Sequence, residues 1–180
     1  MPPSKNLSGD ADNPQERLST TQRWKAFLGG FIEGEGSFCI SIKKNKTSKY
    51  GFNVDTEFFL YQREERKEIL EKAKKFFGSG RIYPKAGNEK VLVFEIADNK
   101  VLHEKVIPFL EKYFLPFSAR KKDFLLFKEA VRMKAKKEHL KREGLLKLVD
   151  IAYEINQSGK QRKRKKEEVV ERILRGHTPG

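Results

Sequence analysis

Two glutamates, Glu33 and Glu35, stand among glycines at the end of an apolar segment that reads Leu-Gly-Gly-Phe-Ile-Glu-Gly-Glu-Gly over residues 28–36. If the segment is a helix, both carboxylates lie at its C-terminal end, where the helix dipole is negative and disfavours each charge by about 0.3–1 kcal/mol. Carboxylates in such a place favour a bound cation, and few carboxylates with open positions for water and phosphate oxygens suit Mg²⁺. The segment is a candidate site for metal-dependent chemistry, although an exposed acidic turn would also account for it.

Glycines interrupt the same segment at Gly29, Gly30 and Gly34, and each costs a helix about 0.5–1 kcal/mol relative to Ala. Close approach of another backbone is the natural reason for such a cost. Ala26 and Gly30 are four residues apart and share one helix face on which a partner helix could pack, and Gly29 and Glu33 lie beside them. A nucleotide-binding glycine loop is excluded, because a helix precedes these glycines and no Gly-Lys-Ser/Thr follows.

The elements that position these residues follow from hydrophobic periodicity. Ser19 and Gln22 form a capping-box pattern, and apolar residues then recur at helical spacing, which predicts an amphipathic helix to about Glu33. Strict alternation of apolar and polar residues predicts strands over 37–46 and 52–61, joined as a hairpin with one polar face.

The rest of the chain alternates between helical and strand patterns. The expected elements are a helix over 63–77 and a second hairpin of short strands over 81–83 and 91–97, with a loop containing Pro84. After them we expect a helix that is capped by Asp98 or Asn99 and interrupted or restarted at Pro108, a helix capped by Ser118, and helices over 143–156 and 167–175. This order predicts an α+β fold, with an antiparallel sheet of two hairpins, helices on one face, and further helices at the C-terminus.

Composition narrows the class of partner. The 180 residues include 39 Lys and Arg against 25 Asp and Glu, a formal net charge of +14, and most of the surplus falls within residues 120–166. Such a charge favours nucleic acid over an acidic protein or a membrane surface as the partner. A single Cys and three scattered His exclude a disulfide scaffold and zinc-finger spacing, so any metal should be bound by oxygen.

No apolar run is long enough for a membrane span, and the first residues lack the apolar part of a signal peptide. We therefore expect a soluble, intracellular protein without membrane contact, in a prokaryotic cytoplasm or an organelle matrix. The expected organisation is a flexible leader over 1–18, a folded core over 19–156 and a basic tail over 157–180.

The polar face of the predicted sheet carries side chains that can reach base edges, and a two-stranded β-ribbon fits the DNA major groove. Any one of them could instead be solvated or face a phosphate. The base-reading candidates are Cys39, Ser41, Lys43, Asn45, Asn53, Asp55, Glu57, Tyr61, Arg81, Tyr83 and Lys85. The phosphate-binding candidates in the basic tail are Lys160, Arg162, Lys163 and Arg164.

Residues 28–36 resemble the LAGLIDADG motif of homing endonucleases, and the order of helices and hairpins that follows is similar to the core of that family. The resemblance covers about residues 19–175. It implies that Glu35, the last acid of the motif, binds a catalytic metal together with the backbone carbonyl of Gly34. Mg²⁺ is the expected ion, with Mn²⁺ or Ca²⁺ as alternative occupants. The sequence departs from the motif in having Glu at both acidic positions, where Asp is common, and Gly29 where Ala is common.

The resemblance also assigns roles outside the motif. Gln62 and Arg66 would position the attacking water and the scissile phosphate, although Arg66 could be an exposed helix residue paired with a neighbouring glutamate. A basic catalytic residue is expected among Arg120, Lys121 and Lys122, with Lys121 preferred. Residues 156–166 and the helix after them resemble a tail that contacts the DNA backbone.

The implied protein is a site-specific, metal-dependent endonuclease that makes double-strand breaks with 3′ overhangs in double-stranded DNA and promotes intron or intein mobility. Because the sequence holds one copy of the motif, two chains must supply the two acids, which implies a homodimer and a nearly palindromic target. Two alternatives stay open, an intron RNA maturase of the same family and a non-catalytic DNA-binding regulator. The intact acids Glu33 and Glu35 argue against the regulator only.

Overall fold

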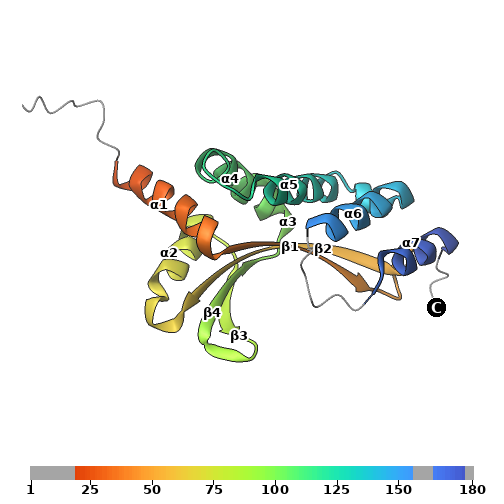
Figure 1. Cartoon of the computed structure of the whole chain (residues 1–180), viewed down its shortest axis with the longest axis horizontal. Helices are drawn as coiled ribbons and strands as arrows, with labels where there is room; N and C mark the ends of the chain where they lie inside the picture. Colours follow the sequence, from red (N-terminus) through yellow and green to blue (C-terminus); the bar gives the residue numbers. More distant parts are fainter. Residues whose placement is uncertain (1–18, 156–163, 177–180) are drawn as a thin grey trace, which may run out of the picture.

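The computed structural model describes residues 19–155 and 164–176. Four strands form one antiparallel sheet in the order β1-β2-β4-β3. Helices α4, α5 and α6 lie along one face of this sheet (Figure 1). The opposite face is concave, with the β3–β4 hairpin toward one end and α7 toward the other. The predicted α+β fold is confirmed. The leader expected over 1–18 and much of the basic tail lie outside the described residues.

The strands are β1 (Gly36–Lys44), β2 (Phe52–Arg63), β3 (Arg81–Lys85) and β4 (Asn88–Ile96). The helices are α1 (Thr20–Glu35), α2 (Glu68–Phe77), α3 (Asn99–Val101), α4 (Ile107–Tyr113), α5 (Lys121–Ala135), α6 (Arg142–Ile155) and α7 (Lys166–Arg175). Short 3₁₀ turns cover Glu64–Arg66 and Glu138–Leu140, and a π-helical turn covers Leu102–Val106. Among the described residues, no helix combines the length and the apolar character that a bilayer span requires.

Helix α1 passes into β1 without a loop. The predicted capping box is present, since Ser19 Oγ accepts from Gln22 N at 3.2 Å and Gln22 Oε1 accepts from Ser19 N at 2.8 Å. At the other end Gly36 is already extended, and its N–H donates to the carbonyl of Ile32. A Cβ at residue 36 would lie 2.5 Å from that carbonyl oxygen, so only glycine fits this junction.

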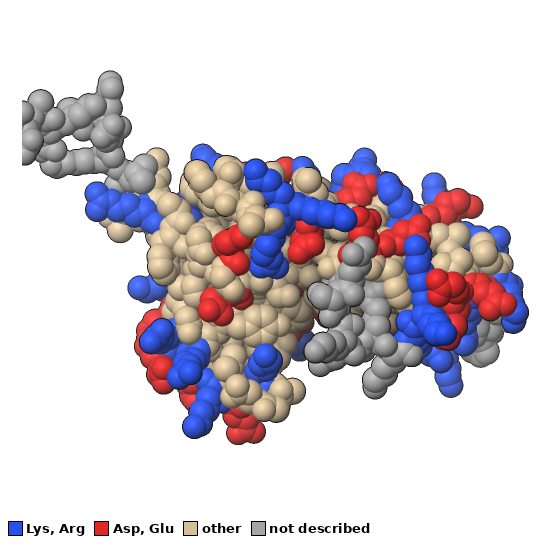
Figure 2. All heavy atoms as spheres, viewed as in Figure 1, with Lys and Arg blue, Asp and Glu red and all other residues tan. Residues whose placement is uncertain are grey.

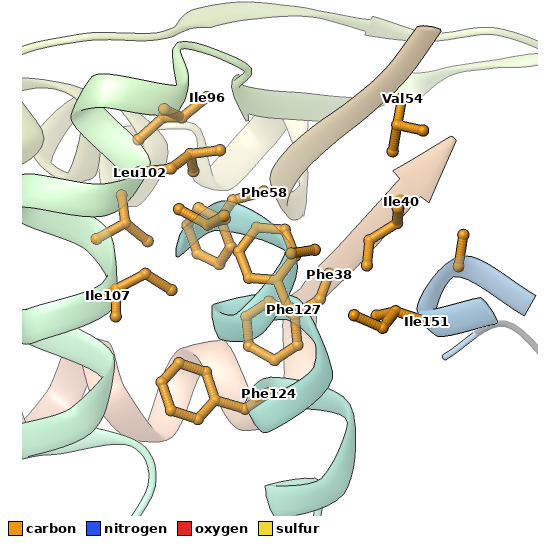
Figure 3. Packing of buried hydrophobic residues seen from close by; sticks show 14 of the residues in the cluster. Phe38, Ile40, Val54, Phe58, Ile96, Leu102, Ile107, Phe124, Phe127 and Ile151 are labelled. Atoms are coloured by element: carbon orange, nitrogen blue, oxygen red, sulfur yellow. The ribbon is translucent and has the colours of Figure 1, made fainter. Parts of the chain in front are cut away.

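The alternation of the strands is confirmed by their register and burial. Phe38 pairs with Phe58, and both side chains point toward the helices, where Phe124 and Phe127 of α5 meet them (Figure 3). The rings of Phe38 and Phe127 stack with centroids 5.1 Å apart. Since Cys39 and its partner Glu57 alternate with these residues, their side chains lie on the opposite, polar face.

Two prolines mark places where predicted elements begin or turn. Pro108 stands where the helix restarts, as one of the two predicted alternatives had it, because it occupies the first turn of α4, where its missing N–H costs little, and the wider π-helical turn precedes it. Pro84 lies inside β3 and not in the loop. It is tolerated there because β3 is an edge strand, and the hairpin turns at Gly87, whose φ is +77°.

Two helices begin at later residues than predicted. The helix expected from residue 63 begins at Glu68, because Arg63 still belongs to β2 and the 3₁₀ turn follows it. Ser118 does not cap α5, which begins at Lys121 with no side-chain cap. The hydroxyl of Ser118 is occupied elsewhere, in the contact with α1 that follows.

Candidate metal and nucleic-acid interface

Glu35 is the last residue of α1 and is exposed, with β1 starting at the next residue. The neighbouring Gly34 is also exposed, and the carbonyls of a last helical turn lack partners within the helix. The site therefore offers oxygen atoms only, which fits a hard cation such as Mg²⁺. Across residues 19–155 and 164–176, no three His, Cys, Asp or Glu side chains gather closely enough to bind a metal.

Glu33 points back into its own chain. Its carboxylate accepts from Ser118 Oγ at 2.6 Å and from Ala119 N at 3.1 Å, while Ser118 Oγ accepts from Arg120 N at 2.9 Å. Glu33 was predicted to lie in a dimer interface. Within one chain, its carboxylate holds the turn that leads into α5, and its place in a dimer interface stays a prediction. Ser118 fails to cap α5 for the same reason.

Gly29 is likewise used within the chain. It is buried against α4, and a Cβ at this position would lie 2.2 Å from the carbonyl oxygen of Tyr113. Its lack of a side chain therefore serves the packing of α1 on α4 within the chain, and a role for Gly29 in a dimer interface stays a prediction.

The other two residues predicted for the interface, Ala26 and Gly30, are exposed on the surface of the chain. Apart from their chain neighbours and the adjacent backbone of α1, no described atom lies within 4 Å of the Cβ that a side chain would add at Gly30 or Gly34. Phe27, beside them, is 56% exposed although it is a large apolar residue. We call Ala26, Phe27, Gly30 and Gly34 the bare face of α1. Small residues spaced by four along a helix allow another backbone to approach closely.

The three basic residues at the start of α5 have different surroundings. Arg120 Nη1 donates to the carbonyl of Gly36 at 2.7 Å, and its guanidinium lies over the ring of Phe38 at 5.3 Å. Lys122 forms an ion pair with Glu154 at 2.9 Å, away from this junction. Lys121 stands between them, exposed at the start of α5. The contacts of Glu33 and Arg120 thus fasten the start of α5 to the α1–β1 junction.

Replacing Glu33 with Gln tests this fastening. The variant loses the carboxylate acceptor of two hydrogen bonds, so the free energy of unfolding should fall by about 1–3 kcal/mol. Urea unfolding of Glu33→Gln, Ser118→Ala and the double variant measures the coupling between the two residues. Substitutions that add independently would show that the Glu33–Ser118 contact does not contribute.

Gln62 and Arg66 follow from the pairing of β1 with β2. Gly36 pairs with Leu60, so the end of β2 lies beside the start of β1, and half-buried Gln62 comes two residues after Leu60. Gln62 Oε1 accepts from the backbone N–H of Arg63 at 2.8 Å. Arg66 is exposed at the end of the 3₁₀ turn, and Glu65 pairs with Arg63 at 3.8 Å. Both candidates therefore sit at the same end of the sheet as Glu35.

The base-reading candidates are brought onto one face of the sheet by its register. Ser41 lies opposite Asp55 and Lys43 opposite Asn53. Asn45 is an exception, because it lies beyond β1, and its side-chain oxygen accepts from Thr47 N at 3.0 Å within the hairpin turn. Asn45 thus shapes this turn through its side-chain oxygen, and its role in base reading stays a prediction. Tyr61 and Lys85 meet across the same face, with the Lys85 amine 5.3 Å from the Tyr61 ring.

Charges on the polar face are largely paired. Lys43 forms ion pairs with Asp55 at 2.9 Å and Glu57 at 3.4 Å, and its hydrogen bond to Asp55 raises its pKa above the ordinary value. Arg81 and Tyr83 both donate to Glu95 of β4. The sheet face therefore presents ordered polar groups and does not act as a general cationic surface.

Sequence reasoning missed Glu95. It stands in the apolar stretch Val-Leu-Val-Phe-Glu-Ile of β4, where a lone acid between Phe94 and Ile96 was the available signal. Burial by itself raises the pKa of this carboxyl, but hydrogen bonds from Arg81 and Tyr83 outweigh it and hold the pKa below the ordinary value. In return, burial and the hydrogen bond to Glu95 raise the pKa of Tyr83 to about 12.

The tail candidates Lys160, Arg162 and Lys163 lie outside the described residues. Arg164 is described, and its carbonyl accepts from Tyr153 Oη at 2.8 Å, which ties the segment before α7 to α6. Lys and Arg side chains are interspersed with Asp and Glu over the end of the molecule that holds α7 (Figure 2).

Comparisons with known proteins agree with this geometry. Residues 28–131 match the family described as LAGLIDADG endonuclease. The DNA endonuclease I-CeuI of Chlamydomonas moewusii is 43% identical over 107 residues, which cover 59% of this chain and 49% of the relative. This chain thus spans about half the length of that curated relative.

Solved structures give the same result. The intron-encoded homing endonuclease I-CeuI complexed with DNA matches with a TM-score of 0.79 and 33% identity, over 88% of this chain and 79% of that one. The archaeal I-Vdi141I complexed with DNA matches with a TM-score of 0.76 and 35% identity, over 84% and 94%. I-SmaMI bound to uncleaved DNA in the presence of calcium ions matches with a TM-score of 0.69 and 29% identity, over 91% and 51%.

Proposed function

The chain belongs to the LAGLIDADG endonuclease family, and from this membership we propose that it is a homing endonuclease that cuts both strands of a long, nearly palindromic DNA target. The observation that carries the proposal is the end of α1, where Glu35 is exposed beside an open, polar sheet face. Such a break in a gene that lacks the intron or intein would promote the mobility of that element.

The chain's own oxygen atoms would hold the metal that this reaction needs. Glu35 and the carbonyl of Gly34 are the ligands from one chain, and water and DNA phosphate would complete the shell. A bound divalent cation such as Mg²⁺ supplies an activated water and stabilises the charge that develops on the phosphate. I-SmaMI, which resembles this chain, is bound to uncleaved DNA in the presence of calcium ions, and this supports the proposal that a divalent cation takes part.

Residues around Glu35 would orient the reacting groups. Gln62 lies at the same end of the sheet and can orient a water through its amide, while exposed Arg66 can bind the scissile phosphate. Lys121, fixed at the start of α5 beside the α1–β1 junction, would stabilise charge at the phosphate or in its water network. Lys43, Asn53 and the other residues of the sheet face would read the bases in the major groove.

Cutting two strands requires two such sites, so we propose a homodimer. Each chain contributes one Glu35, and the bare face of α1 is the surface on which two copies would meet about a two-fold axis. This arrangement brings both exposed helix ends to the centre of the DNA site.

Selection of cut sequences from a randomised DNA duplex library tests the proposed function. With Mg²⁺ we expect double-strand breaks with 3′ overhangs within one nearly palindromic sequence, and with EDTA we expect none, because the metal-bound water and charge stabilisation are lost. Sequence-specific binding without cutting in Mg²⁺ or Mn²⁺ would instead indicate a regulator. Preference for folded intron RNA over every DNA duplex would indicate a maturase.

A further inference from the structure

We propose that Glu95 is a positioning residue for DNA specificity, which clamps Arg81 so that the free edge of its guanidinium reads a guanine in each half-site. The inference rests on the proposed function and names one of its base contacts. Glu95 lies on the open face of the sheet, directly across from Arg81 in the β3–β4 register.

The clamp is a bidentate contact along one side of the guanidinium. Arg81 Nε donates to Glu95 Oε2 at 2.9 Å, and Nη2 donates to Oε1 at 3.0 Å. The Arg81 side chain is 73% exposed, whereas that of Glu95 is only 3% exposed. The carboxylate is therefore covered, while most of the arginine that binds it is exposed to solvent.

The contact leaves the reading edge of the arginine free of Glu95. A guanidinium has five N–H donors, and the carboxylate takes the Nε donor and one Nη2 donor. The remaining Nη1 and Nη2 donors include a parallel pair on the outer edge, which matches the O6 and N7 acceptors that guanine presents in the major groove. Adenine offers a donor in place of O6, so the same edge discriminates between the two purines.

Tyr83 strengthens the clamp from a second direction. Its hydroxyl donates to Glu95 Oε2 at 2.6 Å, and its ring centroid lies 5.2 Å from the Arg81 guanidinium. Both partners of Glu95 thus hold it as a carboxylate with two accepting oxygens. A side chain fixed before binding loses less conformational freedom on contact with DNA, which favours a defined base contact over a mobile phosphate contact.

Lys43 provides a contrast on the same face. It is a point charge with rotatable donors, shared between Asp55 and Glu57, and has no planar edge to match a base. Compared with Lys43, Arg81 therefore offers the more defined geometry for selecting one particular base.

The test measures base preference with the wild-type protein and three variants, on duplexes that carry each of the four base pairs at every position of the selected target. Glu95→Gln replaces one accepting oxygen with an amide NH₂ group, a donor that cannot accept from the guanidinium. Arg81→Lys keeps the charge and removes the fork. Glu104→Gln, at an exposed position on the helical side, is the matched control for the loss of one negative charge.

We expect the wild type to prefer guanine at one position of each half-site. Glu95→Gln and Arg81→Lys should both reduce that preference by about tenfold or more at the same position, with the other positions unchanged. The Glu104→Gln control should keep the wild-type profile. Arg81→Lys should also keep the salt dependence of binding, because it removes no phosphate-binding charge.

Three outcomes would overturn the inference. If Glu95→Gln lowers the melting temperature but leaves the base profile intact, the clamp only holds the hairpin together. If Glu95→Gln does not fold, an unchanged guanine preference in Arg81→Lys shows equally that Arg81 does not read the base. If the wild type shows no base preference at any position, the proposed function fails too, which separates that failure from the loss of a single contact.

Discussion

Glu35→Gln is expected to lower the rate of DNA cleavage by about a thousandfold or more, while specific DNA binding stays within about tenfold of wild type. The amide has almost the same shape but lacks the negative charge that would hold the metal. Because Glu35 is exposed at the negative end of α1, removing its charge should leave the melting temperature unchanged or slightly higher. Loss of activity without loss of stability would separate a metal ligand from a structural residue.

Single-turnover cleavage in Mg²⁺ and DNA binding in Ca²⁺ measure the two halves of this prediction. Glu71→Gln, at an exposed position of α2, makes the same chemical change away from the junction and should cleave at the wild-type rate. Cleavage by Glu35→Gln at close to the wild-type rate would show that Glu35 does not bind the catalytic metal.

Gly30→Leu is expected to abolish dimer formation and double-strand cleavage together. Beyond its chain neighbours and the adjacent backbone of α1, Gly30 has no described atom within 4 Å of the Cβ that a side chain would add, so leucine fits the isolated chain. Leucine also favours a helix over glycine by about 0.5–1 kcal/mol. The fold of one chain should therefore persist, while two helices that meet at this residue are forced apart.

Sedimentation velocity at micromolar concentration, thermal melting and cleavage of supercoiled target test Gly30→Leu. Gly29→Ala is the informative comparison, because its Cβ would meet the carbonyl of Tyr113 at 2.2 Å and should destabilise the chain itself. A Gly30→Leu protein that remains dimeric, or a monomeric wild type that makes double-strand breaks, would contradict the proposed interface.

Local patterns predicted the parts of the fold that depend on neighbouring residues. The capping box at Ser19, the alternation of β1 and β2, and the helix end at Gly78, whose φ is +68°, all follow from residues a few positions apart. The start of α5 did not follow, because the hydroxyl of Ser118 binds Glu33, which is 85 residues away in the sequence. A contact between residues so far apart in the sequence cannot be predicted from the spacing of neighbouring residues.

Part of the candidate site could likewise be predicted from local sequence, and part could not. The motif indicated Glu33 and Glu35 as a pair, but two residues advance a helix by about 200°, so their side chains leave α1 in nearly opposite directions. This geometry alone could have separated an inward acid from an outward one. The role of Glu95 required the β3–β4 register, which brings Arg81 across from it and which no sequence period specifies.

The direct passage from α1 into β1 at Gly36 has a consequence for how target sequences can change. In the proposed dimer, α1 sets the distance between the two chains, and β1 begins to contact DNA with no flexible connection in between. The number of base pairs between the half-sites is then fixed by the rigid backbone that joins α1 to β1 in each chain. Substitutions on the sheet can alter which bases are preferred, yet they cannot lengthen or shorten the gap. A lineage of such proteins would drift to new sequences while keeping the same central spacing.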